Sequence, residues 1–205
     1  MIDLYTWLTS NGRKATIMLE ELGLPYNLHP INITNGEQFS SEFMAINPNS
    51  KIPAIVDRQE GGQSYSVFES GAILMYLGDK TGCFFPTGHR NRYMVIQWLM
   101  FQMGGVGPMF GQLHHFRTRQ DEAPYAYDRY HKETKRLYGV LNERLAHHEY
   151  LADDYSIADI ATFPWVFRNE WHDVDFKEYP HLKRWYDDVY ERPAVQRGLW
   201  LPKLK

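Results

Sequence analysis

The chain has 205 residues, 43% of them hydrophobic and 15% aromatic, so it has ample material for a packed core and is not of disordered composition. Its formal net charge of −3 provides no general attraction to nucleic acid or to an anionic membrane. The single cysteine, Cys83, excludes an internal disulfide, a Cys-x-x-Cys redox pair and a thiolate zinc site. The sequence opens without a basic and apolar leader and contains no run of about 18–20 apolar residues. We therefore expect a cytoplasmic protein with no nucleic-acid or membrane partner.

The first 80 residues alternate between strand and helix patterns. Residues 9–12 (TSNG) read as a loop with N-cap candidates, and Gly23 is expected to end the helix that follows. Because a helix connects the first two strands, we expect those strands to be parallel. Strands are predicted at residues 1–7, 26–33, 52–57 and 64–68, and helices at 14–22, 35–46 and 69–77.

After residue 90 only helical spacing is found. Residues 104–108 (GGVGP) are expected to interrupt or kink the first of these helices, and Ser156-x-x-Asp159 has the spacing of a capping box. The sequence therefore predicts an α/β domain over residues 1–81, a short linker, and an all-α domain over residues 88–205. Helices of this second domain are predicted at residues 91–103, 126–145, 157–167 and 182–190.

Two short stretches have features of a ligand site. The proline of Ile52-Pro53 is either an edge residue or part of a cis bond that turns the Ile52 backbone toward an extended ligand. Glu69 and Ser70 begin a helix, either as an ordinary cap or as a site where backbone N–H groups and a hydroxyl hold a carboxylate. With Glu69 accepting from an ammonium group, the ligand described is an α-amino acid.

Residues 9–12 lie where thioredoxin-like folds carry their reactive cysteines, at the start of the first helix. This chain has hydroxyls and an amide there, and no thiol. The stretch is either a simple cap or a site whose thiol arrives with the ligand. In the second case, a hydroxyl or amide donor would lower the thiol pKa from its usual value of about 8.5.

Three longer motifs follow one another in the chain: NPNSKIPAI at 47–55, FESGAILMYL at 68–77 and YSIADIA at 155–161. Together they resemble the cytosolic glutathione transferases, and the resemblance covers essentially the whole chain. It implies an α/β thioredoxin-like N-terminal domain that binds glutathione, followed by an all-α C-terminal domain.

Within this family the chain is similar to the bacterial Nu class. The similarity is carried by the opening MIDLY, by Thr9-x-Asn11-Gly12, and by GGVGPM at 104–109 and GQLHHF at 111–116. Nu-class proteins are glutathione-dependent disulfide-bond reductases that lack the catalytic tyrosine, serine or cysteine of other classes. The chain is also similar to a yeast regulator of nitrogen catabolism that has the same fold.

The resemblance implies roles for residues of the first domain. Thr9 and Asn11 would lie near the glutathione sulfur and act in catalysis. Glu69 and Ser70 would hold the γ-glutamyl end, while the Ile52 backbone would pair with the cysteinyl segment. Each of these assignments follows the match between this sequence and the family's motifs.

Three further residues complete the implied glutathione site. Gln38 and Lys51 match positions near the glycyl carboxylate, and Arg136 matches an arginine of the helical domain that reaches the ligand. No metal is expected. The adjacent pair His114-His115 points in directions about 100° apart on a helix and is poorly suited to share one ion.

The resemblance implies a glutathione-dependent thiol–disulfide oxidoreductase, in which the thiolate of bound glutathione attacks a small disulfide substrate. Two alternatives stay open: a general glutathione transferase that conjugates glutathione to electrophiles, and a non-catalytic regulatory binding module. The partners expected are glutathione or glutathione disulfide and, by resemblance to the family, a second copy of the chain in a homodimer.

Overall fold

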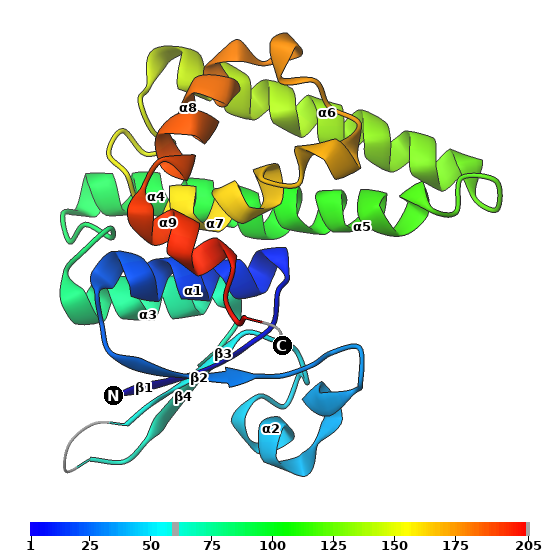
Figure 1. Cartoon of the computed structure of the whole chain (residues 1–205). Coiled ribbons are helices and arrows are strands. Elements are labelled where there is room, and N and C mark those ends of the chain that lie inside the picture. The colour runs from blue at the N-terminus through cyan, green and yellow to red at the C-terminus, as the bar shows by residue number, and fades with distance from the viewer. Residues whose placement is uncertain (59–61, 204–205) are drawn as a thin grey trace. The chain divides into compact units, whose positions relative to one another are not determined.

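The computed structural model describes residues 1–58 and 62–203, which form two compact units (Figure 1). The first unit comprises Met1–Phe85 together with Arg192–Lys205, and the second comprises Pro86–Glu191. Within the described residues, no helix combines the length and apolar character that a membrane span requires.

The first unit is built on a four-stranded mixed sheet in the order β2-β1-β3-β4. The central strand β1 is parallel to β2, as expected, and antiparallel to β3, which in turn is antiparallel to β4. The strands are β1 (Ile2–Thr6), β2 (Tyr26–Pro30), β3 (Ala54–Asp57) and β4 (Tyr65–Phe68).

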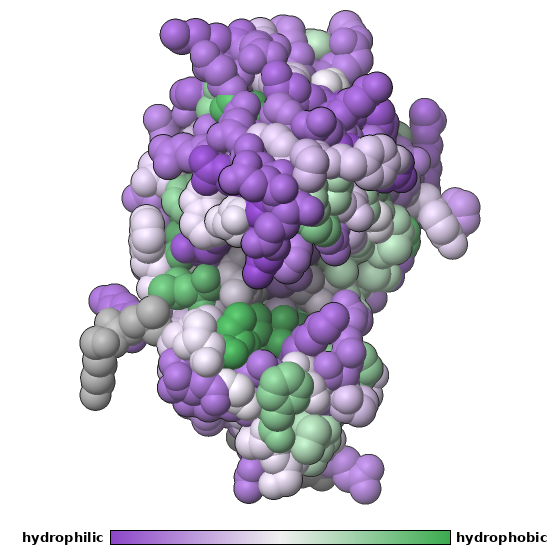
Figure 2. Space-filling model, turned by 90° about the vertical axis from the view of Figure 1, so that its right-hand side faces the viewer, coloured by the Kyte–Doolittle hydropathy of each residue, from purple (hydrophilic) through white to green (hydrophobic). Residues whose placement is uncertain are grey.

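Helices cover both faces of this sheet. The helices α1 (Ser10–Leu22) and α3 (Ser70–Thr81) lie side by side on one face, and α2 (Ser41–Ile46) lies on the other (Figure 1). A short 3-10 turn, Glu37–Phe39, precedes α2. Phe39, before α2, and Met44, within it, have exposed side chains. In Figure 2, hydrophobic residues gather in the lower part of the view, whereas the upper part is largely hydrophilic.

The helix α1 begins at Ser10, four residues earlier than predicted. Thr9 is its N-cap, with a side-chain oxygen that accepts a hydrogen bond from the Gly12 N–H at 3.0 Å. Gly12 packs so closely that a Cβ there would lie 2.1 Å from the carbonyl oxygen of Trp7. The predicted loop therefore forms the first helical turn. Gly23, at φ 61°, ends the helix as expected.

The C-terminal helix α9 (Pro193–Leu199) packs on α1, so this end of the chain belongs to the first unit. The sequence analysis instead included it in the helical domain over residues 88–205. The contact is close because Gly198 has no side chain: a Cβ there would lie 2.7 Å from the backbone of Ile17. Thr16 donates a hydrogen bond to the Gly198 carbonyl at 2.6 Å.

The second unit is all-helical in its described residues apart from two isolated bridges. As predicted for residues 104–108, the α-helix is interrupted: Gln102–Val106 form a π-helical turn between α4 and α5, and Pro108 lies in the first turn of α5. The helices are α4 (His89–Phe101), α5 (Gly107–Arg117), α6 (Pro124–His147), α7 (Ile157–Val166) and α8 (Pro180–Tyr190), with short 3-10 turns at Asn169–His172 and Phe176–Glu178.

The predicted capping box opens α7 and is fully buried. Ser156 caps the helix, and its backbone N–H donates to Asp159 Oδ2 at 3.0 Å. The other carboxylate oxygen accepts from the Leu151 N–H at 3.0 Å and from Trp185 Nε1 at 2.8 Å. Burial raises the pKa of Asp159 to about 6 although these donors favour the charged form. One carboxylate therefore joins α7, α8 and the loop before α7.

The α1–α9 contact predicts opposite effects for two glycine-to-alanine substitutions. Gly198→Ala should lower the free energy of unfolding by about 1–3 kcal/mol, because the methyl group must displace the backbone of α1. Gly139→Ala, in an open position on α6, should raise it by about 0.5–1 kcal/mol through helix propensity. Urea unfolding of both variants and of the parent measures these free energies. Equal unfolding midpoints for Gly198→Ala and the parent would contradict the close contact.

Candidate functional site

The first turn of α1 presents polar groups at a helix N-terminus. Thr9 and Asn11 are half-buried, whereas Ser10 between them is buried. Because the Thr9 oxygen accepts the Gly12 N–H, the Thr9 hydroxyl can still donate its hydrogen outward. The N-terminal end of a helix carries a partial positive charge. This turn therefore favours an anion such as a thiolate.

The start of α3 has the geometry of an anion site. Glu69 occupies the N-cap position at φ 67° and ψ 116°, a left-handed region that residues other than glycine enter at a cost, and its side chain makes no capping hydrogen bond. Ser70 is buried and Glu69 is exposed. The backbone N–H groups of the first turn and the Ser70 hydroxyl are thus gathered at one helix end, while an exposed carboxylate lies beside them.

Lys14 connects these two helix ends, and the sequence analysis missed it. Its side chain extends from α1 to α3, where Nζ donates a hydrogen bond to Ser70 Oγ at 3.2 Å. The residue is only 1% exposed, and burial lowers the pKa of Lys14 to about 7, although the negative charge of Glu69 acts in the opposite direction. The available signal was spacing: Lys14 follows Asn11 by three residues and so lies on the same side of the helix.

The loop before β3 presents the backbone of Ile52. The Ile52–Pro53 peptide bond is cis, and Ile52 is half-buried. Among the described residues, the N–H and C=O of Ile52 bond to no other backbone group. Asn47, a second residue that the sequence analysis gave no role, holds this loop. It is buried, its Nδ2 donates to the Lys51 carbonyl at 2.6 Å, and its Oδ1 accepts from the Asn49 N–H at 2.9 Å.

Gln38 and Lys51 lie in neighbouring loops of the same unit. Gln38 is in the 3-10 turn before α2, and its Oε1 is buried without a hydrogen-bond partner in the part of the chain that the structure describes. A buried acceptor of this kind requires a donor, which a ligand can supply. Lys51 is exposed, just before the cis bond. No direct contact between the two side chains is found among the described residues.

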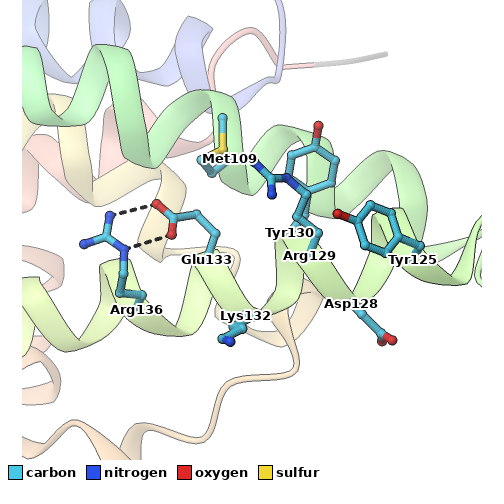
Figure 3. Close-up of a pocket in the computed structure, with 8 residues that line it drawn as sticks. All are labelled: Met109, Tyr125, Asp128, Arg129, Tyr130, Lys132, Glu133 and Arg136. Atoms are coloured by element: carbon cyan, nitrogen blue, oxygen red, sulfur yellow. Dashed lines mark hydrogen bonds and ion pairs between the residues drawn. The ribbon is translucent and has the colours of Figure 1, made fainter.

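Arg136 belongs to the second unit, on α6. Its Nε and Nη2 donate to the two carboxylate oxygens of Glu133 at 2.8 and 2.7 Å (Figure 3), and this guanidinium holds the pKa of Glu133 below its usual value. The pair borders a cavity of about 730 Å³ that is also lined by Arg129, Lys132 and Tyr130. That Arg136 reaches a ligand bound in the first unit stays a prediction.

Two histidines of the helical unit, His114 and His172, form a hydrogen-bonded chain with Tyr138. His114 Nε2 lies 2.7 Å from His172 Nε2, and His172 Nδ1 lies 2.7 Å from the Tyr138 hydroxyl. Burial lowers the pKa of His114 to about 4 and that of His172 to about 2, so both rings are neutral at neutral pH. Residues 1–58 and 62–203 contain no cluster of three His, Cys, Asp or Glu side chains suited to a metal ion.

Two models of one protein family match this chain, one in its N-terminal part and one in its C-terminal part. The family model "Glutathione S-transferase, N-terminal domain" matches residues 1–79, and "Glutathione S-transferase, C-terminal domain" matches residues 101–193. A similar protein is the disulfide-bond oxidoreductase YfcG of Escherichia coli (strain K12), which is 49% identical over 205 residues, covering 97% of this chain and 94% of the relative.

Solved structures give the same result. A glutathione transferase from Burkholderia graminis, with two glutathione molecules bound per subunit, is 47% identical with a TM-score of 0.91, covering 100% of this chain and 89% of that one. A glutathione transferase from Pseudomonas putida, with one glutathione disulfide bound per subunit, is 46% identical with a TM-score of 0.92, covering 98% and 91%.

The fold is therefore a thioredoxin-like domain with a helical domain, as predicted. This chain belongs to the glutathione S-transferase family.

Proposed function

We propose that this protein is a glutathione-dependent thiol–disulfide oxidoreductase of the Nu type. The observation that carries the proposal is the first turn of α1: it offers hydroxyl and amide groups at a helix N-terminus, and the only cysteine of the chain, Cys83, is exposed and follows α3. The reacting thiol must then come from the ligand. The disulfide-bond oxidoreductase at 49% identity supports the same reaction class.

The reaction uses two glutathione molecules for each disulfide. The thiolate of the first attacks one sulfur of the substrate, the S–S bond breaks, and the leaving thiolate takes up a proton. The second glutathione thiolate attacks the resulting mixed disulfide, which releases glutathione disulfide and the second substrate thiol. Donation from Thr9 and Asn11, together with the positive end of α1, stabilises the thiolate and raises its small fraction at neutral pH.

The γ-glutamyl end of glutathione fits the start of α3. Its carboxylate accepts hydrogen bonds from the first-turn N–H groups and from the Ser70 hydroxyl. Its ammonium group donates to the exposed carboxylate of Glu69. The cysteinyl segment pairs with the backbone of Ile52, which bonds to no other backbone group within the described residues. This arrangement directs the thiol toward the N-terminus of α1.

Polar side chains of the first unit are proposed to bind the glycyl end of glutathione. The buried, unpartnered Oε1 of Gln38 accepts from a ligand N–H, and the Lys51 ammonium group faces the glycyl carboxylate. Arg136, held in one orientation by Glu133, contributes a further cation. Glutathione is therefore the ligand that we propose for all eight of these residues, in a reaction without a metal.

A second candidate function is conjugation of glutathione to electrophiles. The solved relatives that carry the name glutathione transferase favour it, because a bound thiolate can also attack an electrophilic carbon. The two activities differ in the second substrate alone.

Direct assay distinguishes these activities. With glutathione and bis(2-hydroxyethyl) disulfide, coupled to glutathione reductase, we expect rapid turnover, whereas conjugation of a chloronitrobenzene should be slow. The reverse pattern would establish a conjugating transferase. Binding of glutathione without either activity would contradict an enzyme and indicate a regulatory module.

Asn11 provides the residue-level test. Asn11→Ala should lower kcat for disulfide reduction by about 10–100-fold, because a donor to the developing thiolate is lost. Asn91→Ala, an exposed asparagine in the first turn of α4, is the matched control and should leave the rate unchanged. If both variants reduce the disulfide at the parental rate, Asn11 has no catalytic role.

We further infer a cytoplasmic homodimer. The cytosol maintains the reduced glutathione that the reaction consumes, and twofold dimers are the commonest assembly of soluble oligomers. Sedimentation equilibrium should return twice the mass of one chain. A single-chain mass at micromolar concentration would overturn the dimer.

A further inference from the structure

We propose that Lys14 is a positioning residue, which orients Ser70 and supplies a buried positive charge for the carboxylate of the γ-glutamyl group. The inference rests on the proposed function, because it takes glutathione as the ligand. It starts from one contact: Nζ of Lys14, on α1, donates to Ser70 Oγ on α3 at 3.2 Å.

The burial of Lys14 is unusual for its residue type. Lysine is among the residues that are almost never fully buried, yet Lys14 is 1% exposed and ranks among the largest fully buried side chains of the chain. Burying an ammonium group is costly unless hydrogen bonds and charges compensate for the lost water. The bond to Ser70 and the charge of Glu69 supply part of this compensation, and a carboxylate bound at the start of α3 would add to it.

The hydrogen bond also sets the direction of the Ser70 hydroxyl. An ammonium group has donors only, so Ser70 Oγ is the acceptor in this bond and its O–H turns away from Nζ. The first-turn N–H groups of α3 are donors as well, and Glu69 provides no side-chain cap for them. Donors therefore gather at this helix end, which is the arrangement that binds a carboxylate.

Electrostatics point the same way. In the free protein, Lys14 lies next to the positive end of α3, and burial brings its pKa down to about 7. The charged group that faces it from α3 is Glu69, whereas Arg13, its neighbour on α1, turns to the Leu199 carbonyl and the Trp200 ring. A bound carboxylate would favour the protonated amine, so binding should take up a proton and weaken as pH rises through this range.

The test uses S-methylglutathione, which has no thiol to titrate. Calorimetry at pH 7.0 in two buffers of different ionisation enthalpy should show uptake of about half a proton by the parent protein. The affinity of the parent for S-methylglutathione should fall about tenfold between pH 6.0 and pH 8.0, and deprotonation of Lys14 should account for most of that loss.

Two variants isolate the lysine. Lys14→Met should weaken binding about tenfold at pH 6.0 and remove the proton uptake at pH 7.0. Lys203→Met makes the same charge change at an exposed position of the first unit and should keep the parental profile. The ligand ammonium group titrates in every variant, so the difference between the profiles reports Lys14 alone.

The outcomes separate this inference from the proposed function. Parallel pH profiles for the parent and Lys14→Met, or no proton uptake by the parent, would overturn the role of Lys14 even where disulfide reduction is intact. Conversely, the parent protein could take up a proton on binding S-methylglutathione and yet fail to reduce disulfides. That result would support the role of Lys14 and contradict the proposed oxidoreductase activity. If Lys14→Met does not fold, the proton uptake of the parent decides the question.

Discussion

The first unit depends on the burial of one helix on several sides. The residues of α1 from Gly12 to Leu19 are all buried, because this helix packs against the sheet, α3 and α9. An unpartnered polar group in such a position costs about 1–3 kcal/mol, so each buried polar side chain has to reach a neighbouring element. The resulting hydrogen bonds are those of Arg13 to the Leu199 carbonyl, Lys14 to the Ser70 hydroxyl and Thr16 to the Gly198 carbonyl.

The packing of α1 also sets the positions of the residues proposed to bind glutathione. The same helix that packs against α9 and α3 carries the half-buried Thr9 and Asn11 at its N-terminus. A change in the packing of α1 would therefore move the proposed thiolate donors and the proposed carboxylate site together. In a thioredoxin-like unit without a cysteine in this turn, positioning of the ligand's sulfur is what the protein contributes to the reaction.

Two buried hydrogen-bond networks lie within the helical unit. Asp159 accepts from Leu151, Ser156 and Trp185, and two hydrogen bonds join Tyr138, His172 and His114 in a linear chain. Both are buried polar networks of the kind that specify one packing arrangement when their members are satisfied. At the surface, the guanidinium of Arg136 pairs with both carboxylate oxygens of Glu133.

The sequence alone determined the features that arise within a few residues. The order of strands and helices in the first 81 residues, the helix end at Gly23 and the capping box at Ser156 follow from local propensity and short-range hydrogen bonds, whereas the helices α5 and α9 were not predicted. The candidate residues Glu69 and Ser70 could be found because they are adjacent in one motif. Only the tertiary structure decided that Lys14 meets Ser70, 56 residues away, and that the C-terminal helix packs on α1, across a separation of 186 residues at Arg13 and Leu199. Such pairings are set by which surfaces must be buried together, and no pattern within one element records the partner on another.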